Sequence, residues 1–136
     1  MNKILCLGIA VVCLVGGASA YWTEMKEIRT TASWLGASTP ERTILNVEEY
    51  IRGSFVYEEG VDAGYQEPYQ LWRSGVGDCT DFAELARTML KYNDIKTERV
   101  RSVTPNDELH DMLFSAYGFV NPLNTQILRV NGGGYW

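Results

Sequence analysis

The chain is short of cysteine and histidine, the two side chains behind much nucleophilic and metal chemistry. Its 136 residues include three cysteines and one histidine, and two of the cysteines, Cys6 and Cys13, fall in an apolar N-terminal segment. Cys79 and His110 remain for the rest of the chain. This excludes a disulfide scaffold there, and too few ligands remain for a structural zinc site, which takes four. We expect neither a metal nor another cofactor.

Positive charge and long apolar runs are scarce as well. The chain has 12 Lys and Arg against 17 Asp and Glu residues, a formal net charge of −5. Nucleic-acid binding needs a basic footprint, so we do not expect it. After residue 20 no segment is long and apolar enough to span a bilayer, which excludes stable membrane insertion of that part. A packed apolar core must therefore hold the fold.

The first twenty residues have the three parts of a secretory signal peptide. Lys3 gives a positive start, the run ILCLGIAVVCLVGG is apolar, and small residues at 18–20 precede Tyr21. The apolar run is shorter than the roughly 20 residues of a membrane span. We expect cleavage after Ala20, a secreted or periplasmic protein, and one domain over residues 21–136.

Apolar spacing and capping signals predict the first helices. One helix is expected over residues 23–34, and a second from Pro40 to Gly53 with Thr39 as its N-cap. Residues 55–57 look extended, and residues 59–76, rich in Gly, Tyr, Gln and Pro, predict a long loop. The aromatic residues expected to line the core and the cleft are Trp34, Tyr57, Tyr65, Tyr69 and Trp72.

The clearest element is a helix that starts at Cys79, with Asp78 as its N-cap and Asn93 as the left-handed residue at its end. Its apolar stripe consists of Phe82, Leu85, Ala86, Met89 and Leu90. Strands are expected over residues 99–103 and 109–115, joined by a turn at residues 105–107, and a third strand from Phe119 after a turn at Gly118. The order predicts an α+β fold in which a central helix packs on a small antiparallel sheet.

Cys79 stands where a thiol can be activated. It follows a glycine-rich turn and lies off the apolar stripe, in the first turn of its helix. Unpaired N–H groups and the helix dipole stabilise a thiolate at such a position, and a histidine is the usual base for it. Three readings of this lone cysteine stay open: a reactive thiol, a buried inert one, and an intermolecular disulfide in a homodimer.

Residues 45–125 resemble the transglutaminase-like branch of the papain-like cysteine enzymes. The specific part is GVGDCTDFAELARTML at residues 75–90, and the segments LHDMLFSAYG and FVNPLN follow it. In that family a Gly-Asp-Cys turn opens the central helix, a histidine begins a later strand, and an Asp or Asn lies on the neighbouring strand. The resemblance implies that Cys79 is the nucleophile, His110 the base and Asn121 the residue that orients the histidine.

The chain departs from the family pattern in two places. The orienting residue is usually Asp, whereas this chain offers Asn121, with Asn124 as an alternative three residues later, and Met112 stands where an aromatic residue usually follows the histidine. An asparagine oxygen can still accept from the imidazole N–H. For the oxyanion, the backbone N–H of Cys79 is one candidate donor and the side chain of Gln70 a second.

The resemblance implies an exported cysteine-dependent enzyme that acts on amide bonds through a thioester. We expect a peptidase or amidase whose partner is a peptide or protein amide substrate. Two alternatives stay open: transfer to an amine, as in transglutaminases, and a catalytically inactive secreted binding module of the same fold. The sequence does not identify the substrate or the oligomeric state.

Overall fold

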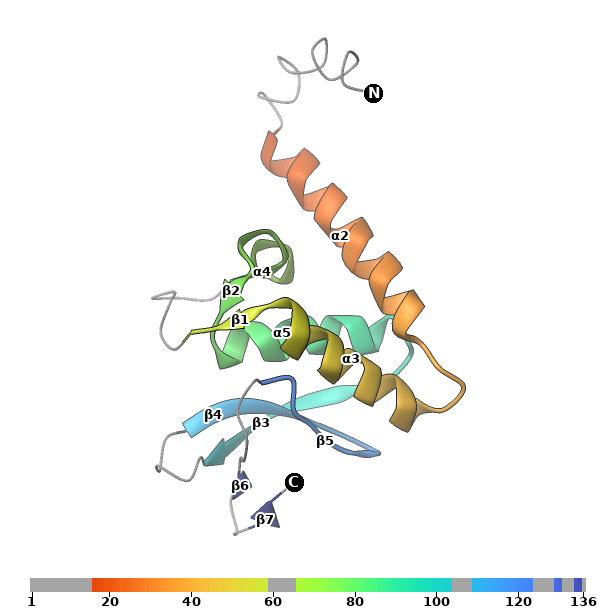
Figure 1. Cartoon of the computed structure of the whole chain (residues 1–136), viewed down its shortest axis with the longest axis vertical. Coiled ribbons are helices and arrows are strands. Elements are labelled where there is room, and N and C mark those ends of the chain that lie inside the picture. The colour runs from red at the N-terminus through yellow and green to blue at the C-terminus, as the bar shows by residue number, and fades with distance from the viewer. Residues whose placement is uncertain (1–15, 59–65, 104–108, 124–128, 131–133, 136) are drawn as a thin grey trace.

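Figure 1 shows the fold as a computed structural model, which describes residues 16–58, 66–103, 109–123, 129–130 and 134–135. Within these ranges it gives the backbone alone for residues 16–20, 101–103, 109–111, 129–130 and 134–135. The helices are α2 (Gly16–Leu35), α3 (Pro40–Ser54), α4 (Pro68–Ser74) and α5 (Cys79–Lys91). None of the helices in these ranges is both long and apolar enough to cross a membrane.

The strands form two sheets. A small parallel sheet pairs β1 (Val56–Tyr57) with β2 (Val76–Gly77). The larger sheet is antiparallel in the order β5-β4-β3-β6-β7. Its strands are β3 (Thr97–Val103), β4 (Leu109–Ser115), β5 (Gly118–Val120), β6 (Arg129–Val130) and β7 (Gly134–Tyr135). The predicted α+β fold, with helices before an antiparallel sheet, is confirmed.

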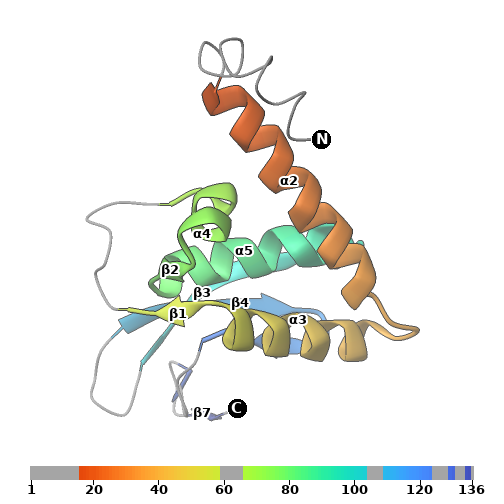
Figure 2. The same cartoon turned by 45° about the horizontal axis from the view of Figure 1, so that its top comes forward.

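The two layers are a group of helices and the larger sheet. Figures 1 and 2 both show α3 and α5 on one side of the sheet, with α4 beside the start of α5 and α2 rising away from the sheet. The core lies between the layers: Ile28 of α2, Val47 of α3, Leu85 of α5 and Leu113 of β4 are all fully buried in one cluster. Helix α5 is thus central, as predicted.

Local signals in the sequence explain α3. The side chain of Thr39 accepts a hydrogen bond from the backbone N–H of Arg42 at 3.2 Å, and Pro40 occupies the first turn. Pro fits there because its missing N–H would have no partner inside the helix. The predicted N-cap is confirmed, and the helix runs one residue beyond Gly53. Its buried residues are Thr43, Ile44, Val47, Glu48 and Ile51.

The helix that begins at Cys79 is confirmed with its cap and its apolar stripe. Asp78 is the N-cap, and its side chain accepts from the backbone N–H of Asp81. All five predicted stripe residues are fully buried: Phe82, Leu85, Ala86, Met89 and Leu90. The left-handed residue after the helix is Asp94, with φ of 60°, and not Asn93. Asn93 instead uses its side-chain amide to donate to the carbonyl of Ala32 at 2.9 Å.

Two other expectations need correction. The loop predicted over residues 59–76 contains α4 and β2, because Pro68 starts a helix there and Gly75, with φ of 77°, ends it. Helix α4 has seven residues, too few for a clear apolar period. Trp34 is 87% exposed, so it lines neither core nor cleft. Tyr65 and the turn at 105–107 lie outside the described residues.

Candidate active site

Cys79 is the first residue of α5 and follows strand β2 and the N-cap Asp78 directly. Its side chain is partly buried and packs against the hydrophobic core. The N–H groups of a first helical turn have no partner within the helix, so a negative charge is favourable at this place. The structure therefore sets the sulfur at a helix N-terminus, where the sequence predicted it.

Gly77 allows the chain to turn tightly before Cys79. A Cβ atom at this position would lie 2.8 Å from Cδ1 of Leu71 and 2.9 Å from both Cβ and Oδ2 of Asp81. Such distances are well below the 3.5–4.0 Å at which non-bonded carbon atoms attract. Glycine is therefore required here by close packing, and the Gly-Asp-Cys turn has a structural reason that does not depend on the reaction.

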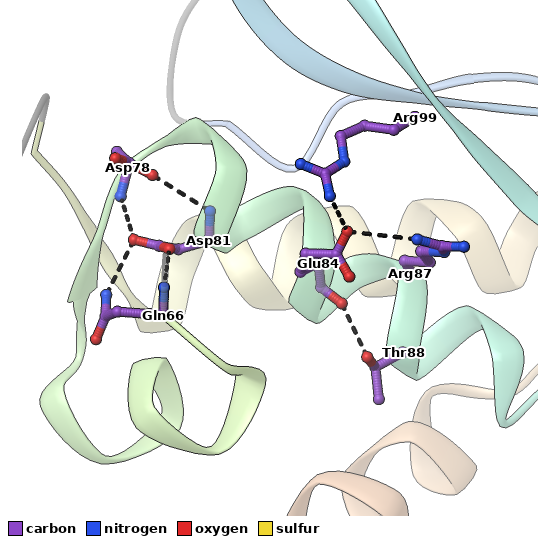
Figure 3. Close-up of polar contacts among 7 residues, drawn as sticks. All are labelled: Gln66, Asp78, Asp81, Glu84, Arg87, Thr88 and Arg99. Carbon is purple, nitrogen blue, oxygen red and sulfur yellow. Dashed lines mark hydrogen bonds and ion pairs between the residues drawn. The ribbon is translucent and has the colours of Figure 1, made fainter. Parts of the chain in front are cut away.

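Asp81 joins the turn to the segment that precedes α4 (Figure 3). Its side chain is fully buried, and Oδ2 accepts from the backbone N–H of Asp78 at 3.0 Å and from Nε2 of Gln66 at 2.9 Å. Its Oδ1 accepts from the backbone N–H of Gln66 at 3.1 Å. A buried carboxylate is stable only when such donors surround it. The sequence predicted Asp81 as a first-turn residue but missed its contact with Gln66.

The electrostatics next to the thiol are mixed. Burial raises the pKa of the Asp78 carboxyl above its ordinary value of 3.8, and repulsion from the Asp81 carboxylate adds to this, while hydrogen bonds from the backbone N–H groups of Asp81 and Thr80 oppose it. Two carboxyl groups beside Cys79 disfavour a thiolate, whereas the helix N-terminus favours it. A positive partner for the sulfur would decide this balance, and His110 is the candidate.

His110 is the second residue of β4, where its backbone pairs with Ser102 of β3. Helix α5 packs on β4, so the strand that carries the histidine lies against the helix that carries the cysteine (Figures 1 and 2). The side chain of His110 lies outside the described part of the chain. Its role as the base therefore stays a prediction, although its strand is where the prediction placed it.

Asn121 follows the last residue of β5, and β5 pairs with β4 through Val120 and Leu113. It thus comes off the sheet beside the strand of His110, as the orienting role requires. Asn121 is 8% exposed, and its side-chain oxygen accepts from the backbone N–H of Leu123 at 3.2 Å. Asn124, the alternative, lies outside the described residues. The orienting role is not tested by these contacts.

Gln70, the candidate oxyanion donor, lies in the first turn of α4. Its side chain is exposed, and Oε1 accepts from the backbone N–H of Glu67 at 2.8 Å in a capping box. This bond gives Gln70 a structural function at the start of α4. Its predicted role at the oxyanion stays a prediction. Among the described residues, no group of three or more His, Cys, Asp or Glu is gathered as metal ligands would be.

The middle of α5 carries two ion pairs. Glu84 accepts from Arg99 of β3 at 2.8 Å and from Arg87 at 3.4 Å (Figure 3). A cavity of about 750 Å³ lies nearby, lined by Glu84, Arg87, Thr88, Lys91, Asp94, Ile95, Lys96 and Thr97. Cys79 is not among these residues, so this cavity is separate from the thiol. Of the two ion pairs, the one with Arg99 joins α5 to β3.

Comparison with known proteins agrees with this arrangement. The sequence profile of the Transglutaminase-like superfamily matches residues 29–122, and no curated protein matches the chain. Among solved structures, the fold is similar to the crystal structure of a "putative cysteine protease" from Cytophaga hutchinsonii, with a TM-score of 0.55 and 12% sequence identity. The likeness covers 76% of this chain and 36% of that protein, so this chain spans well under half of its length. The profile match covers most of the sequence, from α2 to the residue after Asn121, and the chain therefore belongs to the transglutaminase-like superfamily.

Proposed function

We propose that the protein is a cysteine-dependent enzyme that cleaves amide bonds through a thioester. The observation that carries this proposal is the position of Cys79: the first residue of a central helix, on a tight Gly-Asp-Cys turn, with that helix packed on the strand of His110. Helix N-termini lower the energy of a thiolate, and a nearby imidazole is its usual base. Family membership supports the same assignment.

In the proposed reaction His110 takes the proton of the Cys79 thiol, and the thiolate attacks the carbonyl carbon of an amide. The tetrahedral oxyanion collapses to a thioester as the C–N bond breaks, and the imidazolium gives its proton to the leaving amine. Water, deprotonated by His110, then attacks the thioester and releases the acid and the thiol. Asn121 holds the imidazole ring by accepting from its second N–H.

Alkylation of the thiol tests the nucleophile. The rate of reaction with iodoacetamide, followed by intact mass against pH, should be half-maximal well below the ~8.5 at which a free thiol ionises. His110→Ala should move this midpoint upward, because the positive partner is lost. Lys91→Ala should leave the midpoint unchanged, because Lys91 is exposed and is the last residue of α5, at the opposite end of the helix from Cys79. A thiol that reacts only after unfolding would contradict the assignment.

Activity on amide substrates tests the pair as a unit. Cys79→Ala and His110→Ala should each remove nearly all turnover, since residues that act together do not contribute additively. Asn121→Ala should reduce turnover by less, and Asn121→Asp should be tolerated. Activity that survives in His110→Ala would exclude it as the base. If wild type and Cys79→Ala bind one ligand equally and neither cleaves nor cross-links any amide, a binding module of the same fold is the better description.

Hydrolysis and amine transfer share the thioester and differ in what attacks it. Addition of a primary amine to the assay separates them, because a hydrolase releases acid whereas a transferase incorporates the amine. We favour hydrolysis of a peptide or protein amide. We also propose that the protein is exported, with residues 1–20 as a signal peptide that is removed after Ala20.

A further inference from the structure

Helix α3 binds the backbone of Asn121 on both sides. The N–H of Asn121 donates to Oε2 of Glu48 at 2.6 Å, and its carbonyl oxygen accepts from Nη1 of Arg52 at 2.5 Å. Glu48 and Arg52 are four residues apart on α3, so they lie on one face of the helix. Together they bind the N–H and the carbonyl oxygen of Asn121, at the point where the chain leaves β5.

The side chain of Asn121 is held by the residues that follow it in the chain. Its Oδ1 accepts from the N–H of Leu123, which is fully buried, and the intervening residue is the buried Pro122. The proline ring restricts the backbone at this point. The backbone and the side chain of Asn121 are thus held by three hydrogen bonds, of which two come from α3.

We propose that Glu48 and Arg52 are positioning residues that set the place of Asn121 beside the strand of His110. The proposal rests on the proposed function, because it takes Asn121 as the group that orients the imidazole. Both residues contact the backbone of Asn121. They act through Asn121, and a shift of about 1 Å in an orienting group can reduce turnover by about a hundredfold.

Burial of a carboxylate costs free energy, so the presence of Glu48 at this position indicates a specific function. Glu48 is 7% exposed, in a helix face whose other buried members are mostly apolar. An ionised acceptor forms a shorter and stronger hydrogen bond to an N–H than a neutral one does. The 2.6 Å contact is of that kind, and it fixes Asn121 more tightly than an amide side chain could.

The same contact makes the position of Asn121 sensitive to pH. Burial raises the pKa of Glu48 above its ordinary value of 4.5; the Asn121 N–H and the Arg52 guanidinium lower it, and the neighbouring carboxylate of Glu49 raises it. Because the folded-state pKa is raised, the carboxyl gains its proton at a pH above 4.5 as the solution is acidified, and the strong bond to Asn121 is then lost.

Amide NMR tests the contact directly. The proton shift of the Asn121 N–H should titrate in the wild type with a midpoint above 4.5. Glu48→Gln should abolish this titration, because the amide side chain keeps the shape but has no proton to gain. Glu49→Gln, next to it on the exposed face of α3, is the matched control and should keep the titration. A flat Asn121 shift in the wild type, or an unchanged titration in Glu48→Gln, would overturn the proposal.

Kinetics then test the positioning role. Glu48→Gln and Arg52→Gln should lower kcat by about tenfold to a hundredfold with KM nearly unchanged, and Glu48→Gln should also lose an acid limb of the kcat profile. Equal kcat in Glu48→Gln and wild type would overturn the role. The two failures are distinguishable: if the wild type has no activity but the Asn121 shift titrates through Glu48, the proposed function fails and the contact stands.

Discussion

Gly77 is the residue on which the geometry of the thiol depends most directly. It is buried next to Leu71 and Asp81, and the space for a Cβ atom is already filled by both. Asp81 cannot move away easily, because its carboxylate is held by Gln66 and by the N–H of Asp78. A side chain at Gly77 would therefore displace the turn on which Cys79 stands.

We predict that Gly77→Ala destabilises the fold by about 1–3 kcal/mol, as overpacking does elsewhere. The matched control is Gly53→Ala on α3, where nothing lies within 4 Å of the added Cβ among the described residues. That change should stabilise by about 0.5–1 kcal/mol, because alanine favours a helix over glycine. Urea unfolding of both variants measures the pair. Equal effects at the two positions would contradict the packing argument.

Single residues were predictable where their signals are local. Asp78 as N-cap and Cys79 as the first helical residue are confirmed, since both depend on neighbours within three positions. The partners of the buried carboxylates were not predictable. Asp81 bonds Gln66, 15 residues away, and Glu48 bonds Asn121, 73 residues away. No pattern in one sequence shows which distant N–H a buried acid will meet.

Helix α5 is the element that joins the core to the site. Its apolar stripe is buried against α2, α3 and the sheet, and Glu84 pairs with Arg99 on its more polar side. The N-terminus of the helix carries the thiol. Packing of the stripe therefore determines where the sulfur stands relative to β4, the strand of His110.

We predict that Leu85→Ala destabilises the protein by about 2–5 kcal/mol, since it removes a fully buried side chain and leaves a cavity. Leu45→Ala on α3 is the control, because that leucine is 43% exposed. Its effect should be within about 0.5 kcal/mol, as for other surface changes. Thermal unfolding compares the two. A loss at Leu45 as large as at Leu85 would show that burial is not the cause.

The longer elements were predictable in kind, with errors at their ends: α2 begins at Gly16 and not at residue 23, and β3 begins at Thr97 and not at residue 99. The seven residues of β4 match the prediction at both ends, and α5 matches it at its start, because each holds several periods of its pattern. The predicted end of α5 was wrong, since Asp94 and not Asn93 is the left-handed residue. The seven residues of α4 and the two residues each of β6 and β7 were not predicted, since one or two turns or a single residue pair carry no period.

On the scale of the whole molecule, α2 connects the predicted signal peptide to the domain. The helix runs without a break from Gly16 to Leu35, across the predicted cleavage point after Ala20. Its contacts with α4 include the ring of Tyr21 against that of Tyr69, with centroids 5.1 Å apart, and the ion pair of Glu24 with Arg73. Cleavage after Ala20 would leave these contacts in place.

We predict that the exported protein begins at Tyr21, as intact mass would show. Ala20→Leu should block processing, because the cleavage site requires small residues, whereas Ala10→Leu, inside the apolar run, should not. Residues 21–136 expressed alone should unfold within a few degrees of the processed protein. An exported chain that keeps residues 1–20, or one that never leaves the cytoplasm, would contradict the export proposal.

The hydrogen bonds between α3 and Asn121 also indicate when the candidate active site is completed during folding. The β3–β4 and β4–β5 pairs join segments that are close in sequence, and such hairpins close quickly. The Glu48–Asn121 contact instead closes a loop of 73 residues, whose ends meet at a higher entropic penalty. We therefore expect this contact to form late, when the helices have docked on the sheet. We also expect the turn that carries Cys79 to form before Asn121, the proposed orienting residue, is held in place, so that the proposed site would reach full activity only when folding is complete.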